Sequence, residues 1–175
     1  RTPLNAIMGF GEMLLEMDDV PAHAKEMLRT MQNSSAVLLT VINDILDFSK
    51  IEAGQMELEK IPFNLNVTEH DAVALFQARA TEKHLDLLIE FDEAIPATLE
   101  GDPGRIRQVL TNLISNAVKF TEVGHVKVSF ELESETEQIV RLIGRVSDTG
   151  VGIAPENQPK IFGKFAQADG STTRT

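Results

Sequence analysis

The sequence predicts an α-helical hairpin followed by a mixed α/β domain, and two observations lead to this fold class. Apolar residues recur at helical spacing through residues 4–52, whereas the segments after residue 56 alternate between strand-like and helix-like patterns. The sequence Glu-Ala-Gly-Gln at 52–55 separates the two textures. We therefore expect two domains, residues 1–53 and residues 54–175.

The first domain is predicted to contain two helices, residues 4–17 and residues 22–52, joined by a turn. The second helix carries a heptad seam, and further apolar residues beside it widen the stripe. The seam comprises Met31, Ser34, Leu38, Val41, Ile45 and Phe48, and the flanking residues are Leu28, Leu39, Ile42 and Leu46. One hairpin cannot cover this surface, so we expect a homodimer through residues 4–52 that forms a four-helix bundle. The alternative is that the stripe packs on the chain's own second half.

The second domain is predicted to alternate strands with helices and to end in a long loop that begins at residue 149. The expected strands are 56–61, 85–91, 125–133 and 138–148, and the expected helices are 66–84 and 103–120. On the first of these helices the candidates for the buried side are Val67, Val73, Ala74, Phe76 and Ala80.

The helix at 103–120 has clear start signals, with Asp102 as N-cap and Pro103 at its first position. At about 100° per residue, one face collects the apolar residues and a second stripe collects polar ones. The apolar face is Ile106, Val109, Leu110, Leu113 and Ala117, and the polar stripe is Asn112, Asn116 and Lys119, continued by Arg105.

The polar stripe has the chemistry of a site for a metal-bound phosphate. An amide oxygen of Asn112 or Asn116 can ligate Mg²⁺, the amide N–H₂ can donate to phosphate, and Lys119 supplies a positive charge. Taken alone, the stripe is more typical of the solvated face of an amphipathic helix.

Two later motifs add to this pattern. In Ser-Asp-Thr-Gly-Val-Gly-Ile at 147–153, Asp148 ends a predicted strand and can accept a hydrogen bond from an exocyclic amine. Gly150 and Gly152 allow the backbone to approach a ligand closely, although Asp-Thr-Gly is also the sequence of an ordinary turn. Phe162 and Phe165 are apolar residues in a loop-rich tail, where they could anchor a lid or serve in ordinary packing.

The order of these motifs resembles the ATP-binding domain of sensor histidine kinases, within the wider superfamily of gyrase, heat-shock and mismatch-repair ATPases. The start, Arg-Thr-Pro-Leu-Asn-Ala-Ile-Met, resembles the helix after the phosphorylated histidine of these kinases. The resemblance covers essentially the whole chain. It implies a dimerisation and phosphotransfer hairpin followed by an α+β two-layer sandwich, with ATP and Mg²⁺ as cofactors and a response-regulator receiver domain as partner. The sequences near both ends, Arg-Thr-Pro-Leu-Asn-Ala-Ile-Met-Gly-Phe and Phe-Ala-Gln-Ala-Asp-Gly-Ser-Thr-Thr-Arg, are most similar to those of hybrid kinases with attached receiver domains.

Carried over residue by residue, the resemblance implies a nucleotide site. Asn116 matches the Mg²⁺ ligand, Asn112 and Lys119 match phosphate-side contacts, and Phe120 matches the position beside the adenine. Asp148 matches the residue that reads the adenine amine, Gly150 and Gly152 lie under the nucleotide, and Phe162 and Phe165 match the lid anchor. Thr2 matches a position implicated in dephosphorylating the partner regulator.

The chain also departs from the family pattern. The phosphoacceptor histidine would lie three residues before Arg1, and a second glycine-rich motif would follow Thr175. We therefore expect both ends to be cut from a longer protein and the chain alone to be inactive. His23, His70, His84 and His125 lack the context of the phosphoacceptor and are interpreted as surface or packing residues.

Composition excludes several other classes of protein. The net charge of -11 argues against broad nucleic-acid binding, and the absence of cysteine excludes disulfide scaffolds and thiolate metal sites. No apolar run is long enough to cross a membrane and no signal peptide is present, so we expect a cytoplasmic segment whose parent can be membrane-anchored.

Three functions remain open. The first is a protein-histidine kinase in two-component signal transduction. The second is an ATP hydrolase of the gyrase and heat-shock type. These hydrolases use a glutamate base one turn before the metal-binding asparagine, where this chain has Asn112. The third is a non-catalytic dimeric scaffold with a vestigial nucleotide fold.

Overall fold

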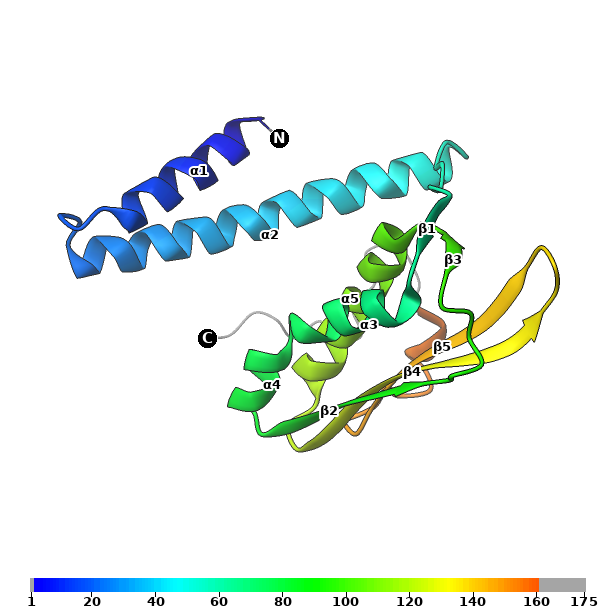
Figure 1. Ribbon diagram of the computed structural model, residues 1–175. Helices are drawn as coiled ribbons and strands as arrows, with labels where there is room; N and C mark the ends of the chain where they lie inside the picture. Colours follow the sequence, from blue (N-terminus) through cyan, green and yellow to red (C-terminus); the bar gives the residue numbers. More distant parts are fainter. Residues whose placement is uncertain (1, 161–175) are drawn as a thin grey trace. The chain divides into compact units, whose positions relative to one another are not determined.

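The computed structural model of the chain describes residues 2–160. It divides into two compact units, Arg1–Glu57 and Leu58–Thr175, and each unit is described by itself (Figure 1). Among the described residues, no helix combines the length and apolar character required to cross a bilayer.

The first unit is a hairpin of two helices, α1 (Thr2–Glu16) and α2 (Ala22–Glu52), as the sequence predicts. Its only buried residues in the described range are Gly11 and Ser35. The two helices approach closely where Gly11 meets Gln32, since a Cβ at Gly11 would lie 3.1 Å from the Gln32 Cγ. The hairpin therefore packs through small and polar residues and buries no apolar side chain completely.

The second unit is a two-layer α+β sandwich in which helices cover one face of a sheet (Figure 1). Strand β4 (Gly124–Glu135) is central, with β2 (Leu85–Phe91) parallel on one side and β5 (Val140–Asp148) antiparallel on the other. The helices are α3 (Leu65–Ala74), α4 (Gln77–Glu82) and α5 (Pro103–Phe120). A separate pair of short strands, β1 (Ile61–Phe63) and β3 (Leu99–Gly101), is antiparallel.

The core of this unit lies between the helices and the sheet. Its buried apolar residues come mainly from α3, α5 and β4: Leu65, Ala72, Val73, Leu110, Ile114, Ala117, Val118, Val126, Val128 and Phe130. Val126, Val128 and Phe130 alternate along β4, as expected for a strand with one face against helices.

The helix α5 begins and ends where the sequence predicts. The Asp102 carboxylate accepts the backbone N–H of Arg105 at 2.9 Å, and this bond is the main cause that lowers the pKa of Asp102. The other carboxylate oxygen accepts the N–H of Glu59 at 3.2 Å, which fixes the chain entering β1 to the start of α5.

Two predicted elements are wrong in their bounds. The expected helix at 66–84 is two helices, α3 and α4. A turn separates them, in which the Phe76 N–H bonds to the Val73 carbonyl three residues back. The expected strand at 56–61 forms only from Ile61 onward. Residues 56–60 belong to no strand, since the pairing with β3 begins at Ile61 and a strand needs a hydrogen-bonded partner.

The predicted buried faces also need correction. Val67 and Ala74 are exposed, since α3 turns Thr68 and Glu69 inward in addition to its apolar residues. On α5, Val109 is 59% and Leu113 45% exposed, while Ile114 and Val118 are buried. The helix is therefore rotated toward residues 114 and 118 relative to the prediction.

Candidate nucleotide-binding site

The polar stripe of α5 is accessible. Asn112, Asn116 and Lys119 are all exposed, opposite the buried side that includes Ile114 and Val118. The Lys119 ammonium lies 4.8 Å from the centroid of the Phe120 ring, which is itself half-exposed. The last turn of the helix therefore presents an amide, a cation and an aromatic ring together.

The Asp148 loop meets this end of α5. Asp148 is the last residue of β5, and its carboxylate accepts the N–H of Gly150 at 2.9 Å. A Cβ placed on Gly150 would lie only 2.5 Å from the Phe120 carbonyl oxygen. Only glycine permits this approach of two backbones, so Gly150 joins the Asp148 loop to the residue that ends α5.

Thr149 is a member of the site that the sequence prediction missed. Its Oγ1 accepts the N–H of His125 at 3.0 Å, and its own N–H donates to the His125 carbonyl at 3.2 Å. These bonds tie the loop to the first residues of β4. The Asp-Thr-Gly sequence indicates a turn at Thr149, but it cannot show that His125, 24 residues away, is the hydrogen-bond partner.

Gly152 differs from Gly150 in what surrounds it. Its φ of +70° is in the left-handed region, and a Cβ there would have no atom within 4 Å. Its backbone is therefore open, and its conformation is one that residues other than glycine adopt only with strain.

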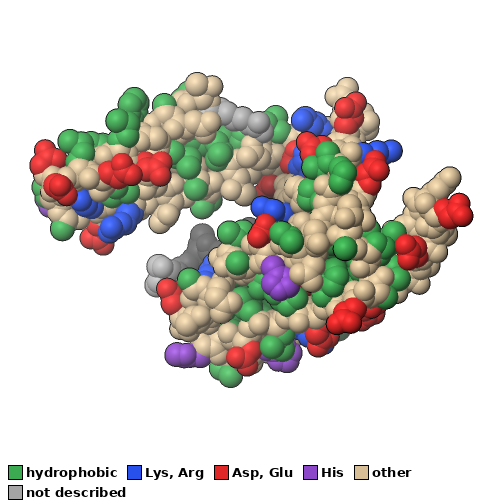
Figure 2. All heavy atoms as spheres, in the orientation of Figure 1, with side chains coloured by type: hydrophobic (Ala, Val, Ile, Leu, Met, Phe, Trp, Pro, Cys, Tyr) green, Lys and Arg blue, Asp and Glu red, His purple; other side chains and the backbone are tan. Residues whose placement is uncertain are grey.

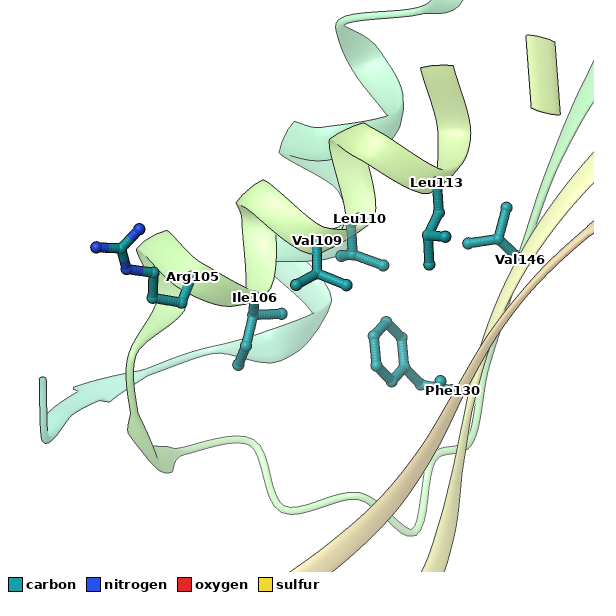
Figure 3. Close-up of a pocket in the computed structure, with 8 residues that line it drawn as sticks. Arg105, Ile106, Val109, Leu110, Leu113, Phe130 and Val146 are labelled. Carbon is teal, nitrogen blue, oxygen red and sulfur yellow. The ribbon is translucent and has the colours of Figure 1, made fainter. Parts of the chain in front are cut away.

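An apolar pocket of about 300 Å³ lies between α5 and the sheet (Figure 3). Val109 and Leu113 point into it from the helix, and Phe130 and Val146 line it from the strands. A Cβ at Gly144 would lie 2.7 Å from the Phe130 ring, so glycine makes room for that ring. This pocket explains why the apolar face of α5 is partly exposed, and its carbon-rich lining does not suit a phosphate.

The donor set limits what metal could bind. Within residues 2–160 no three His, Cys, Asp or Glu side chains gather into a metal site. A hard cation would therefore depend on amide oxygens such as that of Asn116, together with oxygens of its ligand. This combination fits Mg²⁺ delivered with a nucleotide, because Mg²⁺ often binds through few protein ligands and substrate phosphates.

The remaining predicted residues are elsewhere. Thr2 begins α1 in the helical unit, where it is exposed. Phe162 and Phe165 lie outside the described residues. The structure therefore brings Phe120, Asp148 and Gly150 together and places Asn112, Asn116 and Lys119 on one exposed helix face beside them.

Comparison with known families agrees with both halves of the chain. Residues 1–54 match the His Kinase A (phospho-acceptor) domain, and residues 101–175 match the histidine kinase-, DNA gyrase B- and HSP90-like ATPase domain. The chain is 40% identical to hybrid signal transduction histidine kinase K of Dictyostelium discoideum over 99% of its length. The chain belongs to the sensor histidine kinase family. It spans 15% of the length of that curated relative.

Solved structures of histidine kinases share the fold. The full-length kinase ShkA in complex with AMPPNP has a TM-score of 0.76 and 34% identity, covering 97% of this chain and 35% of that one. The histidine kinase ThkA in complex with the response regulator TrrA has a TM-score of 0.56 and 29% identity, covering 94% and 47%. A helical region followed by an α+β domain is thus confirmed as a histidine kinase architecture.

Proposed function

We propose that this chain is part of an ATP-dependent protein-histidine kinase. The parent would transfer the γ-phosphoryl group of ATP to its own histidine and then to an aspartate of a response-regulator receiver domain. The observation that carries the proposal is the close packing of the Asp148 loop on the end of α5, beside the exposed stripe of Asn112, Asn116 and Lys119. This segment would work in the cytoplasm, where ATP is supplied.

Asp148 is suited to read adenine. Its carboxylate is oriented by the Gly150 N–H at 2.9 Å, and the side chain is exposed, so it can accept a further hydrogen bond. The N6 amine of adenine would donate that bond, whereas guanine presents an acceptor at the equivalent position. Phe120 offers a ring for the base, and Gly150 and Gly152 leave the backbone open beside it.

The α5 stripe is suited to the phosphates. Asn116 would ligate Mg²⁺ through its amide oxygen, Asn112 would donate to phosphate, and Lys119 would add positive charge. When bound, Mg²⁺ neutralises charge on the transferred phosphoryl group. Phosphoryl transfer depends mainly on positioning and charge, which accounts for a site of amides, a lysine and glycines.

Asn112 also separates this proposal from ATP hydrolysis. A hydrolase of this superfamily needs a carboxylate base one turn before the metal-binding asparagine. An amide cannot accept a proton from water near neutral pH. The exposed position of Asn112 gives the amide access to a ligand without giving it that chemistry.

The helical unit is proposed to dimerise. Leu38, Val41 and Ile45 are 50%, 46% and 45% exposed along α2, although the sequence places them on a heptad seam. Hydrophobic side chains are visible at several places on the surface of this hairpin (Figure 2). Because the hairpin buries no apolar side chain of its own, a second copy completing a four-helix bundle would supply the missing core.

The start of α1 suits a phosphotransfer domain. Thr2 is in the first turn of α1, so a histidine a few residues earlier would sit beside it at the entrance of the helix. We propose that Thr2 assists dephosphorylation of the regulator. The complex of ThkA with a response regulator supports this class of partner, and the similarity to a hybrid kinase supports a receiver domain in the same parent.

Autophosphorylation of the intact parent with radiolabelled ATP tests the proposal. Asn116→Ala should abolish labelling of the histidine. Because the Asn116 side chain is exposed, the free energy of unfolding should change by no more than about 0.5 kcal/mol. Asn112→Glu is the companion variant, which restores a base and should raise slow ATP hydrolysis without increasing transfer. Normal labelling in a folded Asn116→Ala protein would contradict the assignment.

A further inference from the structure

Lys83 connects the end of α4 to the end of α5. Its side chain is largely buried, with 27% exposed, and its ammonium donates to three backbone carbonyls. The acceptors are Val118 at 3.0 Å, Lys119 at 3.2 Å and Thr121 at 2.9 Å. Val118 and Lys119 are in the last turn of α5 and Thr121 is its C-cap, and all three are more than thirty residues away along the chain.

These bonds satisfy a definite physical need. The last carbonyls of a helix have no partner within the helix, and they carry the negative end of its dipole. An ammonium group has three N–H donors and a positive charge, so one lysine can meet three carbonyls that converge on a point. Lys83 therefore fixes the turn in which Lys119 and Phe120 lie.

The Phe120 carbonyl accepts no bond from Lys83, and it is the carbonyl against which the Asp148 loop packs. Lys83 binds the carbonyls of residues 118, 119 and 121, whereas Gly150 packs against that of Phe120. Thr149 then bonds to the following segment, with its Oγ1 accepting the His125 N–H. Segment 118–125 is thus held by Lys83 at its start and by Thr149 at its end.

We infer that Lys83 is a positioning residue for the adenine end of the nucleotide site. It fixes the Phe120 backbone against which Gly150 and Asp148 are seated, and it does not contact the nucleotide itself. This inference rests on the proposed function. Since the adenine end is distant from the bond that breaks, Lys83 should act on ground-state and transition-state binding alike, and so on KM more than on kcat.

The test uses Lys83→Met in the intact parent, because methionine keeps an unbranched apolar stem and removes the three donors. We expect the KM for ATP in autophosphorylation and the Kd measured by calorimetry to rise about tenfold, with kcat within about twofold of wild type. The preference for ATP over GTP should fall, because the Phe120 backbone would no longer hold Asp148 in position. A variant that is merely less stable would lose kcat through its unfolded fraction and keep its KM.

Two matched controls isolate the carbonyl bonds. Arg107→Met breaks the 3.1 Å contact of Arg107 with Asp71, which ties α5 to α3 near the opposite end of the helix. Glu122→Gln removes the exposed carboxylate that lies 3.7 Å from the Lys83 ammonium while leaving the carbonyls in place. Both controls should keep the wild-type KM for ATP.

Lys83→Arg keeps the charge but spreads its donors over a plane, so it should weaken ATP binding by about threefold. The ATP affinity of Lys83→Arg tests the inference if Lys83→Met does not fold. Wild-type ATP affinity in either folded Lys83 variant, or an equal loss in Arg107→Met, would overturn the inference. Asp148→Ala separates the two proposals: ATP affinity kept there refutes the proposed site, whereas affinity lost there but kept in the Lys83 variants refutes only the role of Lys83.

Discussion

Replacing Glu69 with leucine should stabilise the α+β unit. Glu69 lies on the inner side of α3 with 0% of its surface exposed, and neither carboxyl oxygen has a hydrogen-bond partner among the described residues. Burial raises the pKa of Glu69 from 4.5 to about 7, while the charge of His70 opposes this shift. The folded state therefore resists ionisation of this carboxyl group.

The size and sign of the effect follow from proton linkage. An acid whose folded pKa is raised binds more protons in the folded state, so stability falls as pH rises from 4.5 to about 7 and is then constant. The penalty is about 1 kcal/mol at pH 5 and about 3 kcal/mol at pH 8, from about 1.4 kcal/mol for each pKa unit. Leucine removes this penalty and also the cost of a buried polar group without a partner, about 1–3 kcal/mol at any pH.

Urea unfolding followed by circular dichroism at pH 5 and pH 8 measures the effect. We expect Glu69→Leu to be more stable than wild type at both values, with a gain about 2 kcal/mol larger at pH 8. Glu82→Leu, an exposed carboxylate on the neighbouring α4, is the control and should change stability by no more than about 0.5 kcal/mol at either pH. A gain for Glu69→Leu that does not depend on pH would refute the buried, proton-linked carboxyl.

Three further outcomes are expected. Leu38→Glu together with Ile45→Glu should give monomers in analytical ultracentrifugation, since charges would occupy the exposed seam; a monomeric wild type at high micromolar concentration would contradict this. Asp148→Ala in the intact parent should weaken ATP binding by about tenfold to a hundredfold in calorimetry, because the adenine amine would be enclosed in the complex without its acceptor. His84→Gly should raise the stability by roughly 0.5–1 kcal/mol in thermal melts, because His84 has a φ of +56° that glycine adopts without strain; an unchanged melting temperature would count against this.

The local elements of this protein could be predicted because their signals are local. The periodicity of α2, the Asp102 and Pro103 start of α5 and the alternation in β4 each depend on residues within a few turns or positions of one another. The chemistry of the site is also visible locally, since Asn112 and Asn116 are one helical turn apart and Asp148 ends a strand. Element order and the family resemblance come from the same linear information.

Only the tertiary structure decided which surfaces meet. The rotation of α5 that buries Ile114 and exposes Val109, the inward Glu69, and the Lys83 ammonium on the end of α5 each depend on contacts between segments distant in sequence. Likewise, the sequence shows that Gly150 permits close approach, but only the fold shows that its neighbour is the Phe120 carbonyl. The physical reason is that composition and spacing determine what a residue can bind, whereas packing determines which of those partners lies within reach.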